Sequence, residues 1–306
     1  MSPAFEKTRR LGLGTVQFGL DYGVANKSGR VNVDEAARIV EAASRSGLQV
    51  LDTAYSYGSS EQVLGTLLHP DHRFRIITKT VTCRGPIVTA AHGIQIQLAF
   101  RQSLKRLNQS SVYGLLVHDA DDLLKPGSHH IVAALRQLQS EELVEKIGFS
   151  AYTSDQVDRI IEYFHPDIVQ IPLNVLDQRL VQSGTLTRLR HRGVEIHARS
   201  IFLQGLLLMD PNDLDPYFAP VRGHLMRIGD IIGQTRMQRL SAALRFVFDQ
   251  ETIDMAVVGV CSQRELLEVI DALVAPSKAI PFGEMALNDP KYVDPRNWRP
   301  AETAPA

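Results

Sequence analysis

The sequence predicts an α/β protein with the (β/α)8 architecture of a TIM barrel, in a single domain over residues 1–306. Short apolar runs alternate with amphipathic stretches about every thirty residues, which is the spacing of repeated strand–helix units. The runs are rich in β-branched residues and almost continuously apolar, as in parallel strands buried on both faces. No Gly/Ser-rich linker divides the chain. An open, doubly wound sheet is the alternative, since periodicity alone does not separate the two.

Eight such units fill a core over about residues 8–275, as a closed barrel requires. The predicted strands cover residues 10–15, 50–53, 74–78, 112–118, 146–149, 168–171, 194–198 and 255–258. The predicted helices cover residues 33–46, with Asn32 as cap, 61–68, 94–107, 130–142, 154–164, 180–190, 236–249 and 263–273. A long loop, 210–234, and a Pro-rich tail, 281–306, lie outside this alternation. Long loops of this kind are more often functional or partner-contacting than structural.

The charges of the chain balance, with 33 basic and 34 acidic residues and a net charge of −1. This argues against a general nucleic-acid binder and against a polybasic membrane-surface protein. The segment 201–209 is interrupted by polar residues, and residues 1–10 lack a following signal-peptide stretch, so we expect neither membrane insertion nor export. Two cysteines, Cys83 and Cys261, cannot build a disulfide framework. We therefore expect a cytoplasmic protein.

Polar residues follow three consecutive predicted strands. Asp52 ends the second strand with Tyr57 just beyond it, Lys79 follows the third, and His118 ends the fourth. Each alone has a structural interpretation: a turn cap, the polar end of a buried strand, a core imidazole. Because the carboxyl ends of barrel strands meet at one rim, we expect the four to converge there as catalytic residues.

The four side chains suit proton donation to a carbonyl oxygen. A tyrosine has a pKa of about 10, and an ammonium about 4 Å away favours the phenolate by roughly 4 kcal/mol at an effective dielectric of ~20. Lys79 is therefore expected to lower the pKa of Tyr57, which suits a general acid, while Asp52 holds Lys79 and offsets part of its effect. His118 is placed to hydrogen-bond the same substrate oxygen or to pass the proton.

Signatures of other mechanisms are missing from the sequence. It contains neither a Gly-x-Ser-x-Gly elbow, nor a His-Glu-x-x-His zinc motif, nor a cysteine beside a histidine at a strand end. The pair His129–His130 is interpreted as a surface feature of a helix start. A proton donor for a carbonyl, with no electron source in the protein, implies a bound cofactor that supplies hydride.

At these residues the sequence resembles the aldo-keto reductase superfamily, NAD(P)H-dependent oxidoreductases built on a (β/α)8 barrel. The matching blocks are LGLGTVQFG (11–19), LDTAYSYGSSEQVLG (51–65), IITK (76–79), SLKRL (103–107), LLVH (115–118), IGFS (147–150), Gln170, QGLL (204–207) and VVGVCSQRELLE (257–268). The resemblance implies reduction of an aldehyde or ketone, with Tyr57 as proton donor, Lys79 and Asp52 tuning it, and His118 orienting the carbonyl.

The resemblance also implies NADP(H) as cofactor, with NAD(H) as the alternative. Gly14, Thr15 and Asp52 would line its nicotinamide end, and Ser150 with Gln170 would hold the carboxamide. Gly205 and Leu206 would lie near the pyrophosphate. The remaining cofactor-binding residues implied are Arg199, Ser200, Gly259, Cys261, Ser262, Glu265 and Glu268, the last five at the adenosine end, where a helix start favours phosphate.

Three positions depart from the common family pattern. Ala151 replaces an Asn, Arg199 replaces an aromatic ring that faces the nicotinamide, and Cys261 replaces a basic or hydroxyl residue that binds the 2′-phosphate, a role left to Arg264 and Ser262. Asp119 stands where members with apolar substrates carry an aromatic, and Tyr55 lies near the donor. A polar substrate pocket is therefore expected, for a sugar or another hydroxylated carbonyl.

Two other functions stay open at this point. The first is a cofactor-binding regulatory or sensor subunit with little turnover. The second is a cofactor-free lyase or isomerase that uses Lys79 as a Schiff-base amine. Trp298, in the DPRNW segment of the tail, is interpreted as an anchor that packs the tail on the barrel, with entry into the pocket as the alternative.

Overall fold

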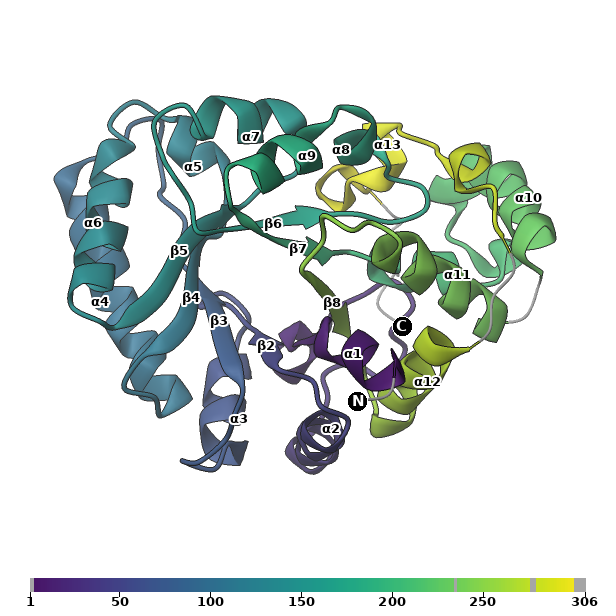
Figure 1. Cartoon of the computed structure of the whole chain (residues 1–306), viewed down its shortest axis with the longest axis horizontal. Helices are drawn as coiled ribbons and strands as arrows, with labels where there is room; N and C mark the ends of the chain where they lie inside the picture. Colours follow the sequence, from purple (N-terminus) through teal and green to yellow (C-terminus); the bar gives the residue numbers. More distant parts are fainter. Residues whose placement is uncertain (1–2, 234–235, 276–278, 300–306) are drawn as a thin grey trace.

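The computed structural model describes residues 3–233, 236–275 and 279–299. Its centre is a closed barrel of eight parallel strands in the order β1 to β8, with β8 paired to β1 (Figure 1). The strands are β1 (Leu11–Gly14), β2 (Val50–Asp52), β3 (Arg75–Lys79), β4 (Val112–Val117), β5 (Val144–Ser150), β6 (Ile168–Pro172), β7 (Glu195–Arg199) and β8 (Met255–Gly259). Closure excludes the open doubly wound sheet and confirms the predicted fold class.

Helices follow the strands and cover the outside of the barrel (Figure 1). They are α1 (Pro3–Arg9), α2 (Val33–Arg45), α3 (Ser60–Leu67), α4 (Ala90–Leu107), α5 (Asp121–Leu124), α6 (His129–Ser140), α7 (Ser154–Ile160), α8 (Arg179–Gln182), α9 (Thr185–His191), α10 (Arg222–Ile232), α11 (Arg236–Phe248), α12 (Gln263–Val274) and α13 (Pro290–Val293). Local signals set their starts: the Asn32 side chain accepts from Glu35 N, as predicted, and Thr153 forms a capping box.

Two predicted segments differ from the structure. The helix expected over 180–190 is split into α8 and α9, because Gly184 between them has φ +71°, a left-handed conformation that ends a helix. The loop expected over 210–234 is largely helical: it holds two 3₁₀ turns, Pro211–Asp213 and Pro216–Val221, and then α10. Residue 234 and the tail residues 300–306 lie outside the described residues.

The inside of the barrel has an apolar layer and, below it, a charged one. Val50, Ile77, Leu116, Ile168, Met255 and Val257 form the apolar layer. Toward the amino ends of the strands, Glu195 accepts hydrogen bonds from Lys146 Nζ at 2.5 Å and Tyr113 OH at 2.7 Å. Its other oxygen lies 2.6 Å from His197 Nε2. Burial works to raise the pKa of Glu195, but these partners lower it to about 2.

The tail packs on the segment that follows β7. Phe218 meets Trp298 edge to face at 5.0 Å between ring centres, and Trp298 Nε1 donates to Tyr292 O at 3.0 Å. Tyr217 OH donates to Lys291 O at 2.9 Å. In Figure 1, α13 lies near α8, and another part of the yellow tail lies beside α10. The interpretation of Trp298 as a packing anchor is confirmed, since its side chain is buried against these residues.

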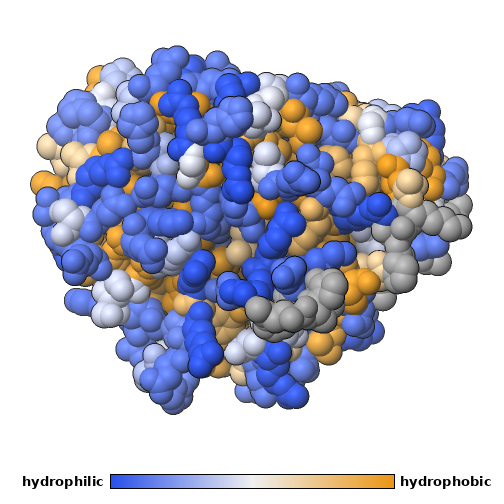
Figure 2. All heavy atoms as spheres, in the orientation of Figure 1, coloured by the Kyte–Doolittle hydropathy of each residue, from blue (hydrophilic) through white to orange (hydrophobic). Residues whose placement is uncertain are grey.

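The face drawn in Figure 2 is mostly hydrophilic, with apolar residues scattered between charged ones. Within the described part of the chain, no helix combines the length and the apolar character needed to cross a bilayer.

Candidate active site

One cavity of about 770 Å³ opens at the carboxyl ends of the strands. Seven of the eight strands contribute to its wall, and β4 does so through His118, the residue that follows it. The residues at or just after the strand ends are Gly14, Asp52, Lys79, His118, Ser150, Gln170, Arg199 and Gly259. Tyr57 reaches the same cavity from the loop after β2. The four predicted catalytic side chains are therefore together in one place.

Asp52 is the centre of the deep end of the cavity. Lys79 Nζ donates to Asp52 Oδ1 at 2.6 Å and to Thr53 O at 2.9 Å, and both side chains of the ion pair are buried. Gln170 Nε2 donates to the second carboxylate oxygen at 2.8 Å. Asp52 therefore has a partner on each oxygen, and Lys79 is fixed below the Tyr57 ring, with Nζ 5.1 Å from the ring centre.

Tyr57 is protonated at neutral pH in this arrangement. Burial and the Asp52 carboxylate raise the pKa of its phenol, and Arg199 lowers it. The sequence predicts instead that Lys79 lowers this pKa. In the structure the net shift is upward, against that prediction, because burial of the phenol and the Asp52 carboxylate outweigh any lowering. Tyr57 is thus a phenol that holds its proton.

His118 faces Tyr57 with its ring nearly perpendicular, at 5.8 Å between ring centres. Its Nδ1 lies 3.2 Å from the Ser56 hydroxyl. Burial, Lys79 and Arg199 together lower the pKa of His118 to about 4. The imidazole is therefore neutral at pH 7, so it serves as a hydrogen-bonding group rather than as a cation.

The deep end fits a nicotinamide carboxamide. With its nitrogen donating to Asp52, Gln170 leaves a buried Oε1 that has no hydrogen-bond partner. A buried acceptor without a partner is costly, and a bound amide N–H would satisfy it. At the other end, a Cβ at Gly259 would lie 2.6 Å from Gln17 Nε2, so a larger residue there would displace the end of the Gln17 side chain. The cavity volume is in the range of cofactor sites.

The outer end of the cavity, at the start of α12, is acidic. Cys261 N donates to Glu265 Oε2 at 2.8 Å, and Gln263 N donates to Glu35 Oε1 at 2.6 Å. Ser262 accepts from Glu265 N. The sequence predicts free N–H groups here for phosphate, but carboxylates already occupy two of them. Arg264 has an 81% exposed side chain that lies 3.7 Å from Glu268.

Most predicted cofactor-binding residues line the cavity. Those that do are Gly14, Thr15, Asp52, Ser150, Gln170, Arg199, Ser200, Gly205, Gly259, Cys261 and Glu265. Leu206, Ser262 and Glu268 are not in the wall: Leu206 is buried in the core, Ser262 caps α12, and Glu268 pairs with Arg264. Thr15 also has a structural role, because its hydroxyl donates to Asp52 O at 3.0 Å.

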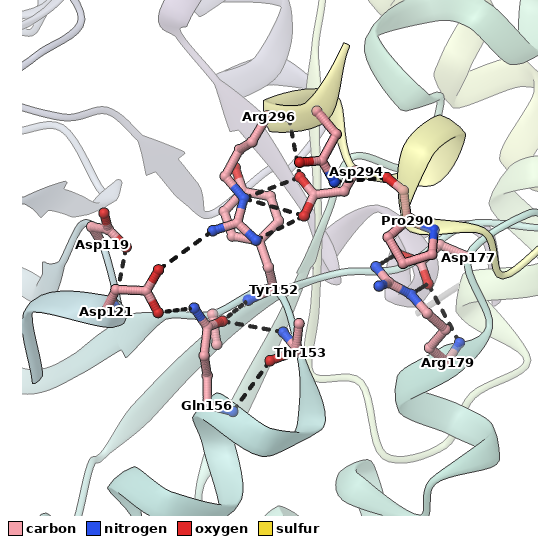
Figure 3. A network of polar contacts seen from close by, with 12 residues as sticks. Asp119, Asp121, Tyr152, Thr153, Gln156, Asp177, Arg179, Pro290, Asp294 and Arg296 are labelled. Atoms are coloured by element: carbon pink, nitrogen blue, oxygen red, sulfur yellow. Dashed lines mark hydrogen bonds and ion pairs between the residues drawn. The ribbon is translucent and has the colours of Figure 1, made fainter. Parts of the chain in front are cut away.

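Tyr152 and Arg296 belong to the cavity wall but were not predicted from the sequence. The Arg199 guanidinium carbon lies 4.1 Å from the centre of the Tyr152 ring, and that of Arg296 lies 3.6 Å from it. Two guanidinium groups this close would overlap on one face, so they occupy opposite faces. Figure 3 shows Arg296 held over the ring by Asp294, which it contacts through two nitrogens, with Asp121 nearby.

The loops after β1 and β7 meet across the outer part of the cavity. Ala25 N donates to Gln204 O at 3.4 Å, and Tyr22 contacts the Gln204 side chain. Gly205 has φ +90°, and a Cβ there would lie 2.4 Å from the Ala25 Cβ. The close approach of the two loops therefore depends on glycine at this position. Lys27 and Ser28 of the β1 loop also line the cavity.

Comparison with known proteins agrees with this site. The model of the Aldo/keto reductase family matches residues 10–283. The chain belongs to the aldo/keto reductase family. As a member, it is an oxidoreductase that uses a nicotinamide cofactor and acts on a carbonyl compound or its alcohol.

Several relatives of this aldo/keto reductase are known by sequence or structure. It is 24% identical over 298 residues to the NADH-specific methylglyoxal reductase of Escherichia coli (strain K12), covering 88% of this chain and 87% of that protein. It is 24% identical over 283 residues to the D-threo-aldose 1-dehydrogenase of Pseudomonas sp, covering 78% and 84%. An aldo-keto reductase from Bacillus halodurans in its holo form has the same fold, with a TM-score of 0.71, 18% identity and 88% of each chain covered.

Proposed function

We propose that this aldo/keto reductase reduces a small polar aldehyde or ketone with NADH, and that Tyr57 donates the proton. One observation carries the proposal: a protonated, cavity-facing phenol lies above a buried Lys79–Asp52 pair, next to an amide acceptor that lacks a partner. A nicotinamide bound in the cavity would supply hydride to the carbonyl carbon.

The protein residues then handle the proton and the carbonyl. Tyr57 gives its proton to the carbonyl oxygen as negative charge develops there. Lys79 stays an ammonium, because Asp52 stabilises it, and its positive charge below the ring limits the cost of the phenolate left behind. Neutral His118, whose Nδ1 lies 3.2 Å from the Ser56 hydroxyl, hydrogen-bonds the same oxygen. Ser150 and Gln170 orient the carboxamide.

The acidic outer end supports NAD(H) in place of the NADP(H) implied by the family resemblance. Glu265 would repel a 2′-phosphate, whereas it can accept a hydrogen bond from a ribose hydroxyl. Cys261 supplies no positive charge. The E. coli relative is named as NADH-specific, which agrees with this assignment.

A polar substrate is supported by the wall around Tyr57. Ser56, Thr82, Asp119 and Arg296 all line it, and relatives are named for methylglyoxal and for an aldose. Both cysteines are unpaired thiols, which supports the proposal of a cytoplasmic location.

The test compares the wild type with Tyr57→Phe. NADH oxidation is followed at 340 nm with methylglyoxal and with a panel of aldoses, and NADH binding is measured by calorimetry. We expect Tyr57→Phe to bind NADH normally and to lose turnover by about 10²–10⁴-fold. Tyr55→Phe, which removes a hydroxyl bonded to Gln102, is the matched control and should keep its turnover. Full activity of Tyr57→Phe would overturn the role of Tyr57, and the binding of NADH without any carbonyl-dependent oxidation would favour a sensor subunit.

A further inference from the structure

Arg199 is a cation at the deep end of the cavity whose charge is not matched by a carboxylate. Lys79 is paired with Asp52 and Arg296 with Asp294. Arg199 donates only to neutral oxygens: Nε to Ser150 Oγ at 3.3 Å, Nη1 to Ser200 Oγ at 3.3 Å and Nη2 to Ala151 O at 3.2 Å. No ion pair of Arg199 is found within the described parts of the chain.

The Arg199 guanidinium is held in position by its stacking contact with the Tyr152 ring. Tyr152 lies between Arg199 and Arg296, and Arg296 is held by the Asp294 carboxylate at 2.7 Å. A guanidinium that moved away from Tyr152 would lose this stacking contact. The side chain of Arg199 is half-buried at the end of β7, next to the strand that carries Gln170. Arg199 therefore keeps its charge at the deep end of the cavity.

The reacting ring of the cofactor must lie beside this charge if the proposed function holds. Hydride and proton are added to the two atoms of one carbonyl bond, so the ring must be within a few ångströms of the Tyr57 hydroxyl. Ser150, which accepts from Arg199, and Gln170, with its unpaired oxygen, border the same end. The Arg199 charge is close enough to lower the pKa of Tyr57, His118 and Lys79.

We propose, resting on the proposed function, that Arg199 makes the site selective for the reduced form of the cofactor. The nicotinamide ring is neutral in NADH and carries a positive charge in NAD⁺. An unmatched cation in a half-buried site repels the charged ring of NAD⁺ and does not repel the neutral ring of NADH. Salt screens this repulsion only in part. Arg199 therefore weakens the binding of NAD⁺ relative to NADH.

The direction of the effect on catalysis follows from linkage. Tighter binding of NADH shifts the equilibrium on the enzyme toward NADH and carbonyl, so Arg199 does not assist hydride transfer itself. Its contribution lies in the other steps of the cycle. The enzyme takes up NADH in the presence of NAD⁺, and NAD⁺ leaves readily after reduction, so that product inhibition by NAD⁺ is weak.

The test measures the dissociation constants of NADH and NAD⁺ by isothermal titration calorimetry at one ionic strength. We expect the ratio Kd(NAD⁺)/Kd(NADH) to fall at least about tenfold in Arg199→Gln, because the unit charge near the ring is lost. Arg199→Lys, which keeps the charge, should retain a ratio near that of the wild type. Arg159→Gln makes the same chemical change in a surface ion pair with Asp155 and should leave the ratio unchanged.

A ratio Kd(NAD⁺)/Kd(NADH) in Arg199→Gln within twofold of the wild-type ratio would overturn the inference. If the ratio stays unchanged and the KM for a 2-oxo acid rises, Arg199 binds an anionic substrate instead. If Arg199→Gln does not fold by circular dichroism, Arg199→Tyr gives the uncharged comparison with a ring in place. If the wild type binds neither form, the proposed function fails and this inference with it. Binding of both forms with an insensitive ratio overturns this inference alone.

Discussion

Lys79 Nζ and Asp52 Oδ1 lie 2.6 Å apart at the ends of neighbouring strands, and both side chains are almost fully buried. A buried ion pair of this kind is a weak source of net stability, but each member depends strongly on the other. In this aldo/keto reductase Asp52 holds two groups in position: the Lys79 ammonium below the Tyr57 ring and the side-chain amide of Gln170.

Asp52→Ala should lower the free energy of unfolding by about 3–5 kcal/mol, because it leaves a buried ammonium without a partner. Adding Lys79→Met should restore much of that loss, although the double variant will be inactive. Urea denaturation measures both. Glu41→Ala, which breaks an exposed pair with Arg45, should cost less than about 1 kcal/mol. Equal losses in the single and the double variant would contradict the account of the pair.

The pH dependence of kcat/KM should show no inflection at about pH 6.5, the usual pKa of histidine. Because the pKa of His118 is lowered to about 4, the imidazole is neutral above that value and becomes protonated only below it. Activity should therefore be level from about pH 6 to 8 and fall toward pH 4. A break near pH 6.5 that disappears in His118→Gln would show that the imidazole titrates normally.

Glu265→Gln should shift cofactor preference toward NADPH. The substitution removes the negative charge but keeps an oxygen for Cys261 N. We expect the ratio of kcat/KM for NADH to that for NADPH to fall at least about tenfold, since one repulsive charge near the 2′-position is lost. The exposed Glu284→Gln serves as the control of equal charge. A wild type that already prefers NADPH would contradict the proposed use of NADH.

Stability should fall in acid through Glu195. Its pKa is lowered to about 2 in the folded protein, against about 4.3 for a free glutamate. A lowered carboxyl pKa contributes stability above the unfolded value, and this contribution is lost as the pH falls from about 4.3 to 2. Glu195→Gln should be less stable at pH 7 by a few kcal/mol and should lose less between pH 5 and 2. Thermal unfolding at several pH values gives the pH dependence of stability for the wild type and for Glu195→Gln. The same dependence in both proteins would contradict this role of Glu195.

The barrel and its catalytic rim could be predicted from the sequence because both follow from local patterns. Strands buried on both faces appear as short apolar runs, and a closed parallel barrel brings all their carboxyl ends to one rim. Asp52, Lys79 and His118 were therefore found by reading the ends of three runs. The break at Gly184 was missed because the apolar periodicity continues across it, whereas the backbone turns left-handed there.

The Arg199–Tyr152–Arg296 stack could not be predicted in this way. Arg296 reaches the cavity from a tail that is docked by contacts such as Trp298 on Phe218, between residues 80 positions apart in the chain. No local sequence pattern predicts a contact between residues so far apart in the chain. The Tyr57 pKa was misjudged for a related reason: its value depends on how deeply the phenol is buried and on how near the Asp52 carboxylate lies, and both are set by the folded protein.

The docked tail also has a consequence for the order in which the enzyme is made. Chains grow from the amino terminus, so all eight strands leave the ribosome before Arg296 and Trp298 do. The barrel can close around its apolar layer while the substrate side of the cavity still lacks its last wall. In a growing chain the barrel strands are thus available to fold before Arg296, which lines the cavity, has left the ribosome.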